Sequence, residues 1–415
     1  MAAPNHSLSI SINGLRIGRR LLKIRDVRTI LLTAPIPKEH QWTSDFGTAL
    51  AFNAAIVVIE TDEGITGYAE AKGTPQVMKA IIEHELKPIL VGQDPTRVQY
   101  LWERMFNGFR LGLSLYYGRS QPIATAPGEL MCAISGIDVA LWDIAGKAAG
   151  VPIYKLMGGG MRTRIRAYAS GGHGPAGEIG EEVARYVEKG FKAVKMRVGG
   201  RDHPRMVDGA VRRVREAREA VGPEVEIMLD AHGSTNVGDA IKIARALEQF
   251  DITWYEEPVV FHNFEGLAEV RHSTPIPVAT GENLYTRFAF RDLALARAAD
   301  VWQPDMAMVG GLTEMLRIAN LANAFEFSLA PHSWGSTLLW AANLQLAAAV
   351  PNCLIFEFGQ AYNLLLTDLV TTPVRVEKDG YVEIPQGPGL GVEIDPDAEK
   401  RYPFNPNLPE RIAIV

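Results

Sequence analysis

Cysteine is scarce in this sequence, and long apolar runs are absent. The 415 residues include two cysteines, Cys132 and Cys353, in apolar surroundings and without the spacing of a disulfide framework or a metal-binding pair. No stretch of about 18 apolar residues is present, which excludes a membrane-spanning helix, and the N-terminus lacks an apolar signal core. We therefore expect a cytoplasmic protein with reduced thiols and no membrane partner.

Basic charge is not in excess either. The formal net charge is −6, so we expect no general attraction to nucleic acid or to an anionic membrane. One segment, 15–28, is an exception because its basic residues alternate with apolar ones. These basic residues are Arg16, Arg19, Arg20, Lys23, Arg25 and Arg28. We interpret the alternation as the solvated face of a strand, and the alternative is an arm that binds nucleic acid.

The length and composition of the chain indicate two domains. Its 415 residues exceed one ordinary core, and 47% apolar with 22% charged residues is typical of a globular protein. A β-branched run at 27–36, a hairpin at 55–71 and an apolar helix at 129–149 predict an α+β capping domain over residues 1–150. The C-terminal segment, 371–415, contains a hairpin-like tail that we expect to return to this domain.

Between residues 151 and 370 the pattern alternates between strand and helix. The expected strands are 164–169, 191–197, 225–230, 252–256, 276–280, 300–304, 326–330 and 353–357. Helical patterns fill the gaps, for instance at 177–189, 203–221, 237–249, 311–324 and 336–349. This α/β alternation predicts a modified TIM (β/α)-type barrel with its chemistry at the C-terminal ends of the strands. A doubly wound sheet is disfavoured because YASGGHG (168–174) lacks the GxGxxG spacing.

Three acidic residues end successive strands at equal spacing. Asp230, Glu256 and Glu282 are separated by 26 and 26 residues, about one strand and one helix. In a parallel barrel such positions lie at the same end of neighbouring strands, so the three carboxylates converge and require a cation. Hard oxygen ligands favour Mg²⁺. The alternative is that each acid only caps the helix that follows its strand.

The remaining strand ends carry a second set of polar residues. Lys195 and Arg197 point to the same face because alternate strand residues share a side. Asp305 and His332 end neighbouring strands, so the carboxylate can orient the imidazole and raise its basicity. Glu357 ends the eighth strand. A metal ion beside an oriented imidazole is suited to abstracting a proton α to a carboxylate.

With these residues in this order, the chain resembles the mandelate racemase subgroup of the enolase superfamily. Three further segments are similar to that subgroup: IETDEGITGYAEA (59–71), SGIDVALWDIAGK (135–147) and PQGPGLGVEID (385–395). The resemblance implies an N-terminal α+β capping domain, a modified barrel and a C-terminal segment that returns to the cap. It also implies Mg²⁺ as cofactor, an enediolate intermediate and a homo-oligomer.

One departure from the racemase pattern points to the acid-sugar dehydratases. The racemase has a second lysine as base two residues after the first, and here Arg197 occupies that position. An arginine stays protonated and is a poor base. His332 would then act alone on C2 of a sugar acid, and loss of the C3 hydroxyl would give a 2-keto-3-deoxy acid. Lys195 and Arg197 would bind the substrate, or Arg197 would only pair with a metal-ligand carboxylate.

His232 is the second departure. It follows Asp230 by two residues, as in several sugar-acid dehydratases of the resembled subgroup. This arrangement predicts a general acid for the leaving hydroxyl, or a substrate contact. Two alternatives stay open: His232 bonds only the loop backbone, or His332 itself returns the proton in a syn elimination.

Other polar residues are weaker candidates. Glu357 is predicted to hydrogen-bond the substrate carboxylate or the enediolate, or else to be satisfied by backbone. His40 and Trp42 lie in the irregular loop 37–53, which by resemblance folds over the barrel mouth and selects the substrate; the alternative is a plain surface loop. Four further histidines show no pairing and are expected to be structural or exposed: His173, His203, His262 and His272.

Three other functions compete with a dehydratase. A racemase or epimerase needs a base on both faces of the substrate, and Lys195 is the one candidate left for the second face. A cycloisomerase of this superfamily would use a lysine pair flanking the metal rather than an Asp–His couple. A non-catalytic binding protein on the same fold predicts damaged machinery, whereas the metal-binding acids and the Asp–His couple are all in place.

Overall fold

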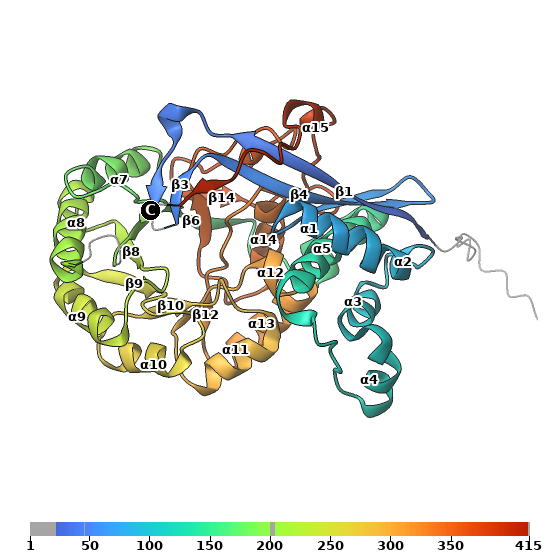
Figure 1. The fold of residues 1–415 in the computed structure, drawn as a ribbon, viewed down its shortest axis with the longest axis horizontal. Coiled ribbons are helices and arrows are strands. Elements are labelled where there is room, and N and C mark those ends of the chain that lie inside the picture. The colour runs from blue at the N-terminus through green and yellow to red at the C-terminus, as the bar shows by residue number, and fades with distance from the viewer. Residues whose placement is uncertain (1–21, 45, 200–203, 414–415) are drawn as a thin grey trace, which may run out of the picture.

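A curled sheet of eight parallel strands forms the centre of the molecule (Figure 1). The computed structural model describes residues 22–44, 46–199 and 204–413. The eight strands are β6 (Arg164–Ser170), β7 (Ala193–Arg197), β8 (Glu226–Asp230), β9 (Ile252–Glu256), β10 (Val278–Thr280), β11 (Val301–Trp302), β12 (Ser328–Leu329) and β13 (Phe356–Gly359). Each expected strand is present, and the predicted modified TIM barrel is confirmed.

The barrel is closed unevenly. Neighbouring strands pair in chain order from β6 to β12, and β13 pairs in parallel with β6. The last gap in the barrel lies between β12 and the segment that leads into β13. There a single parallel bridge pairs Leu329 with Cys353. Strands β10 to β12 are shorter than expected because two residue pairs join each neighbour there.

The barrel interior is filled below the strand ends. One buried side chain from each of the eight strand regions forms a separate apolar cluster: Tyr168, Ala193, Met228, Trp254, Ala279, Val301, Ala330 and Ile355. Such a layer makes the barrel a packed core rather than a pore. Polar side chains can therefore gather only above this layer, at the C-terminal ends of the strands.

Helices cover the outside of the barrel (Figure 1). They are α7 (Ile179–Glu188), α8 (Met206–Val221), α9 (Val237–Leu247), α10 (Phe264–His272), α11 (Thr286–Leu295), α12 (Met306–Val309), α13 (Gly311–Ala324) and α14 (Thr337–Ala349). In α7 the buried Ile179, Val183 and Tyr186 recur at helical spacing and face the strands. All of α14 is buried, because the capping domain packs on its other side through β5 and α6.

The capping domain combines an antiparallel sheet with helices. Its strands are β1 (Ile24–Pro35), β4 (Ala51–Thr61) and β5 (Thr66–Ala71), so the hairpin expected at 55–71 is confirmed. Its helices are α1 (Pro75–Ala80), α2 (Lys87–Leu90), α3 (Val98–Asn107), α4 (Leu111–Tyr117), α5 (Met131–Ala149) and α6 (Ile153–Leu156). Helix α5 lies so close to β5 that a Cβ on Gly67 would be 2.2 Å from the Ala140 carbonyl oxygen.

Of the basic segment 15–28, the structure describes residues 22–28. Arg25 and Arg28 lie on β1, are 66% and 43% exposed, and both pair with Glu60 on β4. For these two residues the predicted solvated strand face is confirmed. Arg16, Arg19 and Arg20 lie outside the described residues.

The C-terminal segment touches both the barrel and the cap. Strand β14 (Tyr381–Glu383) pairs antiparallel with β6, at the N-terminal end of the barrel. The chain then returns to the cap, where Leu390 donates its backbone N–H to Asp143 on α5, and α15 (Ala398–Arg401) follows. Finally β15 (Arg411–Ile412) joins β2 (Thr43–Ser44) and β3 (Gly47–Ala49) in a small antiparallel sheet.

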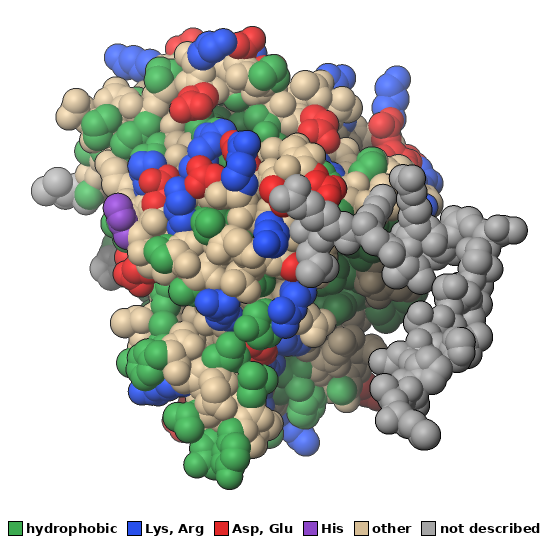
Figure 2. Space-filling view, turned by 90° about the vertical axis from the view of Figure 1, so that its right-hand side faces the viewer, with side chains coloured by type: hydrophobic (Ala, Val, Ile, Leu, Met, Phe, Trp, Pro, Cys, Tyr) green, Lys and Arg blue, Asp and Glu red, His purple; other side chains and the backbone are tan. Residues whose placement is uncertain are grey.

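The surface carries one conspicuous apolar projection. Figure 2 shows hydrophobic side chains gathered at the lower end of the face that includes α3 and α4. Phe109, Tyr116 and Leu115 are 88%, 82% and 67% exposed there.

Both cysteines are buried and form no disulfide. Within the described residues, no helix has the length and apolar character needed to cross a membrane.

Candidate active site

A cavity of about 410 Å³ opens at the C-terminal ends of the barrel strands. Its size suits a small organic ligand. Its lining contains charged or titratable side chains from the barrel, the cap and the C-terminal segment: Lys72, His173, Lys195, Arg197, Asp230, His232, Glu257, Glu282, His332, Glu357 and Arg411. Ser44, Phe46 and Trp334 contribute to the cover. The predicted site thus comes together at the predicted end of the barrel.

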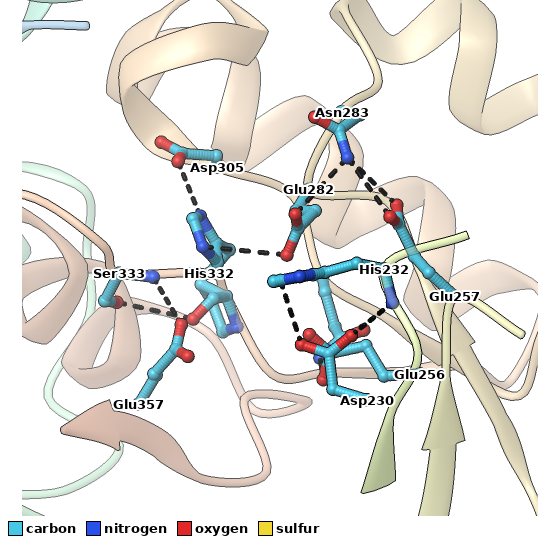
Figure 3. Close-up of polar contacts among 12 residues, drawn as sticks. Asp230, His232, Glu256, Glu257, Glu282, Asn283, Asp305, His332, Ser333 and Glu357 are labelled. Atoms are coloured by element: carbon cyan, nitrogen blue, oxygen red, sulfur yellow. Dashed lines mark hydrogen bonds and ion pairs between the residues drawn. The ribbon is translucent and has the colours of Figure 1, made fainter. Parts of the chain in front are cut away.

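His332 and Asp305 form the expected couple (Figure 3). Nδ1 of His332 lies 2.7 Å from Oδ2 of Asp305, and the two residues form a parallel bridge. A carboxylate accepts, so Nδ1 carries the hydrogen and Nε2 is left as the basic nitrogen of a neutral ring. Nε2 faces the cavity, 3.6 Å from Oε2 of Glu282. The hydrogen bond to Asp305 therefore leaves Nε2 of His332 as the ring nitrogen that can accept a proton from the cavity.

Lys72 joins this couple from the capping domain. Its Nζ lies 2.5 Å from the same Asp305 oxygen that binds His332, and it follows directly after β5. The other Asp305 oxygen accepts from the backbone N–H of Ala307, at the start of α12. Burial alone would raise the pKa of Asp305, but Lys72 and His332 outweigh it and lower that pKa. Asp305 is thus a fixed, charged partner for the histidine.

The electrostatics favour proton uptake by His332. Burial alone would lower the pKa of its imidazole, but the carboxylates of Glu282 and Asp305 outweigh burial and raise it. Burial alone would also lower the pKa of the Lys72 ammonium. The carboxylate of Asp305 outweighs burial, so that pKa is raised. Lys72 is therefore a cation and a poor base where it stands.

A partly buried acidic cluster lies beside the couple. Among the described residues, potential ligand atoms of Asp230, His232 and Glu282 lie within 4.8 Å of one another. Asn283 bridges Glu282 to a further carboxylate, Glu257, at 3.2–3.3 Å (Figure 3). Burial and repulsion from Glu282 raise the pKa of Glu257 well above its usual range. Carboxylates that repel one another in this way fit a divalent cation with oxygen ligands.

Glu256 is placed differently from Asp230 and Glu282. Its Oε1 lies 2.6 Å from Nζ of Lys195, and its Oε2 accepts from Gln303 and Trp254. The side chain is fully buried and is outside the compact group formed by Asp230, His232 and Glu282. Its role as the third metal ligand stays a prediction. The adjacent Glu257, which the spacing argument passed over, faces the cavity.

Lys195 and Arg197 are both held by acids. Nζ of Lys195 lies 2.6 Å from Glu256, 3.1 Å from Glu357 and 3.6 Å from Asp230. Although burial opposes it, this surround raises the pKa of Lys195 well above its usual range. Arg197 contacts a carboxylate oxygen of Asp230 and Nε2 of His232. Of the two roles predicted for Arg197, the structure contains the pairing with Asp230, a predicted metal-ligand carboxylate.

Glu357 and His232 also have specific hydrogen-bond partners. Glu357 accepts from the backbone N–H of Ser333 at 2.7 Å, in addition to contacting Lys195 (Figure 3). His232 has a positive φ of 46°, and its backbone N–H donates to Asp230 at 2.8 Å. Burial lowers the pKa of its imidazole to about 4. Both residues stand at the cavity, as expected from their positions at strand ends.

The loop 37–53 covers the barrel mouth through residues other than those expected. Phe46 stacks on His232 with ring centroids 4.5 Å apart, and Ser44 also lines the cavity. His40 is exposed and stacks on Tyr362 at 4.4 Å, outside the cavity lining. Trp42 lines a neighbouring cavity instead, and its ring centroid lies 5.9 Å from that of His173. The loop forms a cover, and among its described residues Ser44 and Phe46 line the cavity.

Several site residues had no signal in the sequence. His173 was expected to be structural or exposed, yet it lines the cavity, in the loop that follows β6. Lys72 and Arg411 come from segments outside the barrel, and nothing in the local sequence links them to it. His262 and His272 are exposed as expected, and His203 lies outside the described residues.

Comparison with known proteins agrees with this geometry. Residues 27–158 match the model described as mandelate racemase / muconate lactonizing enzyme, N-terminal domain. Residues 178–398 match the enolase C-terminal domain-like model. The chain is 34% identical to D-galactarolactone cycloisomerase of Agrobacterium fabrum, over 91% of this chain and 98% of that protein. It is 39% identical to D-galactonate dehydratase of Ralstonia nicotianae, over 81% and 87%.

Two further relatives extend the comparison. An arabinonate dehydratase of Saccharolobus solfataricus is 33% identical over 91% of this chain and 99% of its own. Among solved structures, a putative mandelate racemase from Bordetella bronchiseptica has a TM-score of 0.84 and 36% identity, covering 92% of this chain and 95% of its own. The relatives of this chain thus include sugar-acid dehydratases and a cycloisomerase. The chain belongs to the mandelate racemase / muconate lactonizing enzyme family of the enolase superfamily.

Proposed function

We propose that this protein is a Mg²⁺-dependent dehydratase that converts an aldonate or aldarate to a 2-keto-3-deoxy acid. The observation that carries the proposal is His332, oriented by Asp305 at 2.7 Å and facing a partly buried acidic cluster across the cavity. Its relatives named D-galactonate dehydratase and arabinonate dehydratase support the same class of substrate. The proposed metal ligands are Asp230, Glu256 and Glu282.

The proposed reaction begins at C2 of the sugar acid. Nε2 of His332 takes the C2 proton, and the electron pair of the C–H bond moves into the carboxylate to give an enediolate. Mg²⁺ at the acidic cluster would supply the positive charge that stabilises this intermediate. Lys195, held as an ammonium, adds a second positive charge at the same end of the cavity.

Elimination completes the proposed reaction. The enediolate electrons form the C2–C3 double bond, the C3–oxygen bond breaks, and the hydroxyl leaves as water once it receives a proton. The resulting enol then tautomerises to the 2-keto-3-deoxy acid. The proton comes from His332, which has just taken up the C2 proton, in a syn elimination. The alternative donor is His232, which stands at the cavity beside Asp230 and, with its pKa lowered to about 4, would first have to take up a proton.

The geometry disfavours a two-base reaction. A racemase or epimerase would need a neutral amine or imidazole on the face opposite His332. Lys195 is surrounded by Glu256, Glu357 and Asp230, and Arg197 is paired with Asp230. Both side chains are held as cations and cannot act as bases. The remaining imidazole at the strand ends, His232, has Arg197 against its Nε2, so a single-base elimination fits the site better.

A second candidate function is the opening of a cyclic sugar acid. D-galactarolactone cycloisomerase is 34% identical to this chain, and a structure of 3,6-anhydro-D-galactonate cycloisomerase from Zobellia galactanivorans has a TM-score of 0.78 and 32% identity. The same removal of a C2 proton by His332 would open a ring if a ring oxygen, instead of a hydroxyl, left from C3. Both candidates therefore share the base and differ in the leaving group.

Proton NMR in D₂O tests these proposals. The protein with Mg²⁺ is incubated with a library of aldonic and aldaric acids and their cyclic forms. A deuterated 2-keto-3-deoxy acid made from one acid, and not made by His332→Asn, is the expected result. Deuterium entering C2 without elimination would replace the dehydratase by an epimerase. A product from cyclic forms alone would favour ring opening.

A further inference from the structure

Arg411 differs from the other cations that line the cavity in the partners of its charge. Lys72 binds Asp305 at 2.5 Å, Lys195 contacts three carboxylates, and Arg197 contacts Asp230. Arg411 lines the same cavity, and among the described residues no carboxylate forms an ion pair with its guanidinium. A half-buried guanidinium without a counter-ion is poorly compensated, and it favours the binding of an anionic ligand.

The guanidinium is held in place by polar and aromatic contacts. Nη1 of Arg411 donates to Oγ of Ser44 at 3.1 Å, and the group lies 5.8 Å and 6.0 Å from the ring centroids of Phe46 and Trp42. The backbone is fixed as well, because Arg411 pairs with Ala49 between β15 and β3. These contacts orient the charge and leave most of its fork of N–H donors to a ligand.

The neighbouring acid, Glu410, acts on the charge of Arg411 without forming an ion pair with it. Glu410 accepts the backbone N–H of Asn53 at 2.9 Å and lines a separate cavity of about 550 Å³ between the cap and the C-terminal segment. It is not part of the active-site lining, whereas Arg411 lines both hollows. The side of Arg411 that faces the proposed substrate is therefore positive.

Arg411 stands on the cover, and the acidic cluster stands on the strand ends. Phe46 lies between the two, against Arg411 on one side and against His232 on the other, at 5.8 Å and 4.5 Å. A substrate whose C1 carboxylate faces Lys195 and the acidic cluster therefore extends toward the cover. With C1 placed there, we expect its far end to lie toward Arg411, which lines the same cavity.

We propose that Arg411 binds the distal carboxylate of the substrate, and that the substrate class is therefore the aldarates, which carry a carboxylate at both ends. This inference rests on the proposed dehydratase function. A planar guanidinium binds a carboxylate through two parallel hydrogen bonds and binds a neutral hydroxymethyl group far less well. A site built for an anion rejects the uncharged analogue because its own charge would stay unpaired.

Matched pairs of acids test the inference. D-Glucarate with D-gluconate, and galactarate with D-galactonate, share their C2–C5 configuration and differ in the distal group. Turnover in Mg²⁺ and D₂O is followed by proton NMR for the wild type, Arg411→Met and Arg411→Lys. We expect kcat/KM for the aldarate to exceed that for its aldonate partner at least tenfold. Arg411→Met should cut this ratio by roughly ten- to a hundredfold, and Arg411→Lys should cut it less.

Two control variants separate charge recognition from support of the cover. Ser44→Ala removes the hydrogen bond to Arg411 and keeps its charge, so a support role predicts equal losses for both acids in Ser44→Ala and Arg411→Met. Arg401→Met removes an arginine that pairs with Asp395 outside the cavity, and should leave the ratio unchanged. Equal loss for both acids in Arg411→Met, with no change in the ratio, would overturn the inference.

The remaining outcomes are also decisive. Turnover of an aldonate in preference to its aldarate would overturn the inference and leave the dehydratase proposal standing. If no acid is turned over, the dehydratase proposal fails, and calorimetric binding of the same four acids with Mg²⁺ decides about Arg411. Tighter binding of the dicarboxylates, lost in Arg411→Met, supports the inference, and equal affinities contradict it.

Discussion

At the scale of single residues, Lys72 makes a contact on which the proposed chemistry would depend. Its Nζ shares one oxygen of Asp305 with His332, at 2.5 Å. Lys72→Met should leave Asp305 buried with one partner fewer, and removing one member of a buried ion pair costs about 3–5 kcal/mol. We expect kcat for C2–H exchange to fall by roughly ten- to a hundredfold, measured by NMR in D₂O.

The control for Lys72 is another lysine of the cap. Lys79 pairs with Glu83 at 2.5 Å on the cap surface, 45% exposed and outside the cavity lining. Lys79→Met should therefore leave exchange unchanged. If Lys72→Met lowers thermal stability and leaves kcat as in the wild type, its role is structural only. Partial recovery in Lys72→Arg would support positioning of Asp305 by charge.

His232 supplies the second prediction at this scale. Its ring stands beside Asp230 and under Phe46, at the cavity. If it protonates the leaving hydroxyl, His232→Asn should retain exchange of the C2 proton and lose elimination. General acid catalysis contributes about 10²–10⁴-fold, so the loss should be large. Unchanged turnover in the variant would instead assign the proton transfer to His332.

Site residues were predictable where they followed a strand period. Asp230 and Glu282 were found because equal spacing puts them at equivalent strand ends, and Asp305 and His332 because their strands are neighbours. Lys72 could not be found, since its contact with Asp305 spans 233 residues. Glu257 was missed because strand alternation turns it away from the barrel axis, while its φ of 36° turns the chain back.

At the scale of elements, the contact between α5 and β5 decides the stability of the cap. A Cβ on Gly67 would lie 2.2 Å from the Ala140 carbonyl oxygen and 2.7 Å from Ile144. Gly67→Ala should therefore lower the free energy of unfolding by about 1–3 kcal/mol, the usual cost of overpacking. Urea unfolding measures this difference.

Gly112 is the matched control for Gly67. It lies in α4, and a Cβ there would have no neighbour within 4 Å. Gly112→Ala should raise stability by about 0.5–1 kcal/mol, because alanine loses less backbone freedom in a helix. Equal effects of the two substitutions would mean that α5 adjusts and that the close approach is not fixed.

Elements with local signals were predicted well, and elements made by distant pairing were not. The eight strands and the hairpin β4–β5 follow from alternation and β-branched runs. Strands β2 and β3 were expected as an irregular loop. They are two and three residues long, and β3 pairs with β2 on one side and with Arg411 and Ile412 on the other. A partner more than 350 residues away leaves no local pattern in the loop.

At the scale of the whole molecule, the cavity is assembled from three parts of the chain. The barrel supplies the acids and the base, the cap supplies Lys72, and the C-terminal segment supplies Arg411. The fold itself was predictable because alternation and the order of the motifs agree over nearly the whole chain. The closed cavity was not, since it depends on how the cap and the tail pack over the barrel mouth.

This assembly predicts that Mg²⁺ stabilises the whole protein. A ligand that binds only the folded state adds RT ln(1 + [L]/Kd), about 2.7 kcal/mol at a hundredfold excess over Kd. Tm should therefore rise by a few degrees with Mg²⁺, as measured by differential scanning calorimetry. Asp230→Asn should abolish this increment, whereas Asp397→Asn, on the exposed start of α15, should retain it.

The same measurement decides which acids hold the metal. Glu256 is engaged by Lys195 and Gln303, while Glu257 faces the cavity beside Asn283. If Glu256 is the third ligand, Glu256→Gln should lose most of the Mg²⁺-dependent rise in Tm, and Glu257→Gln should keep it. The reverse result would move the ligand by one residue, and Lys195 would then hold Glu256 as a structural ion pair.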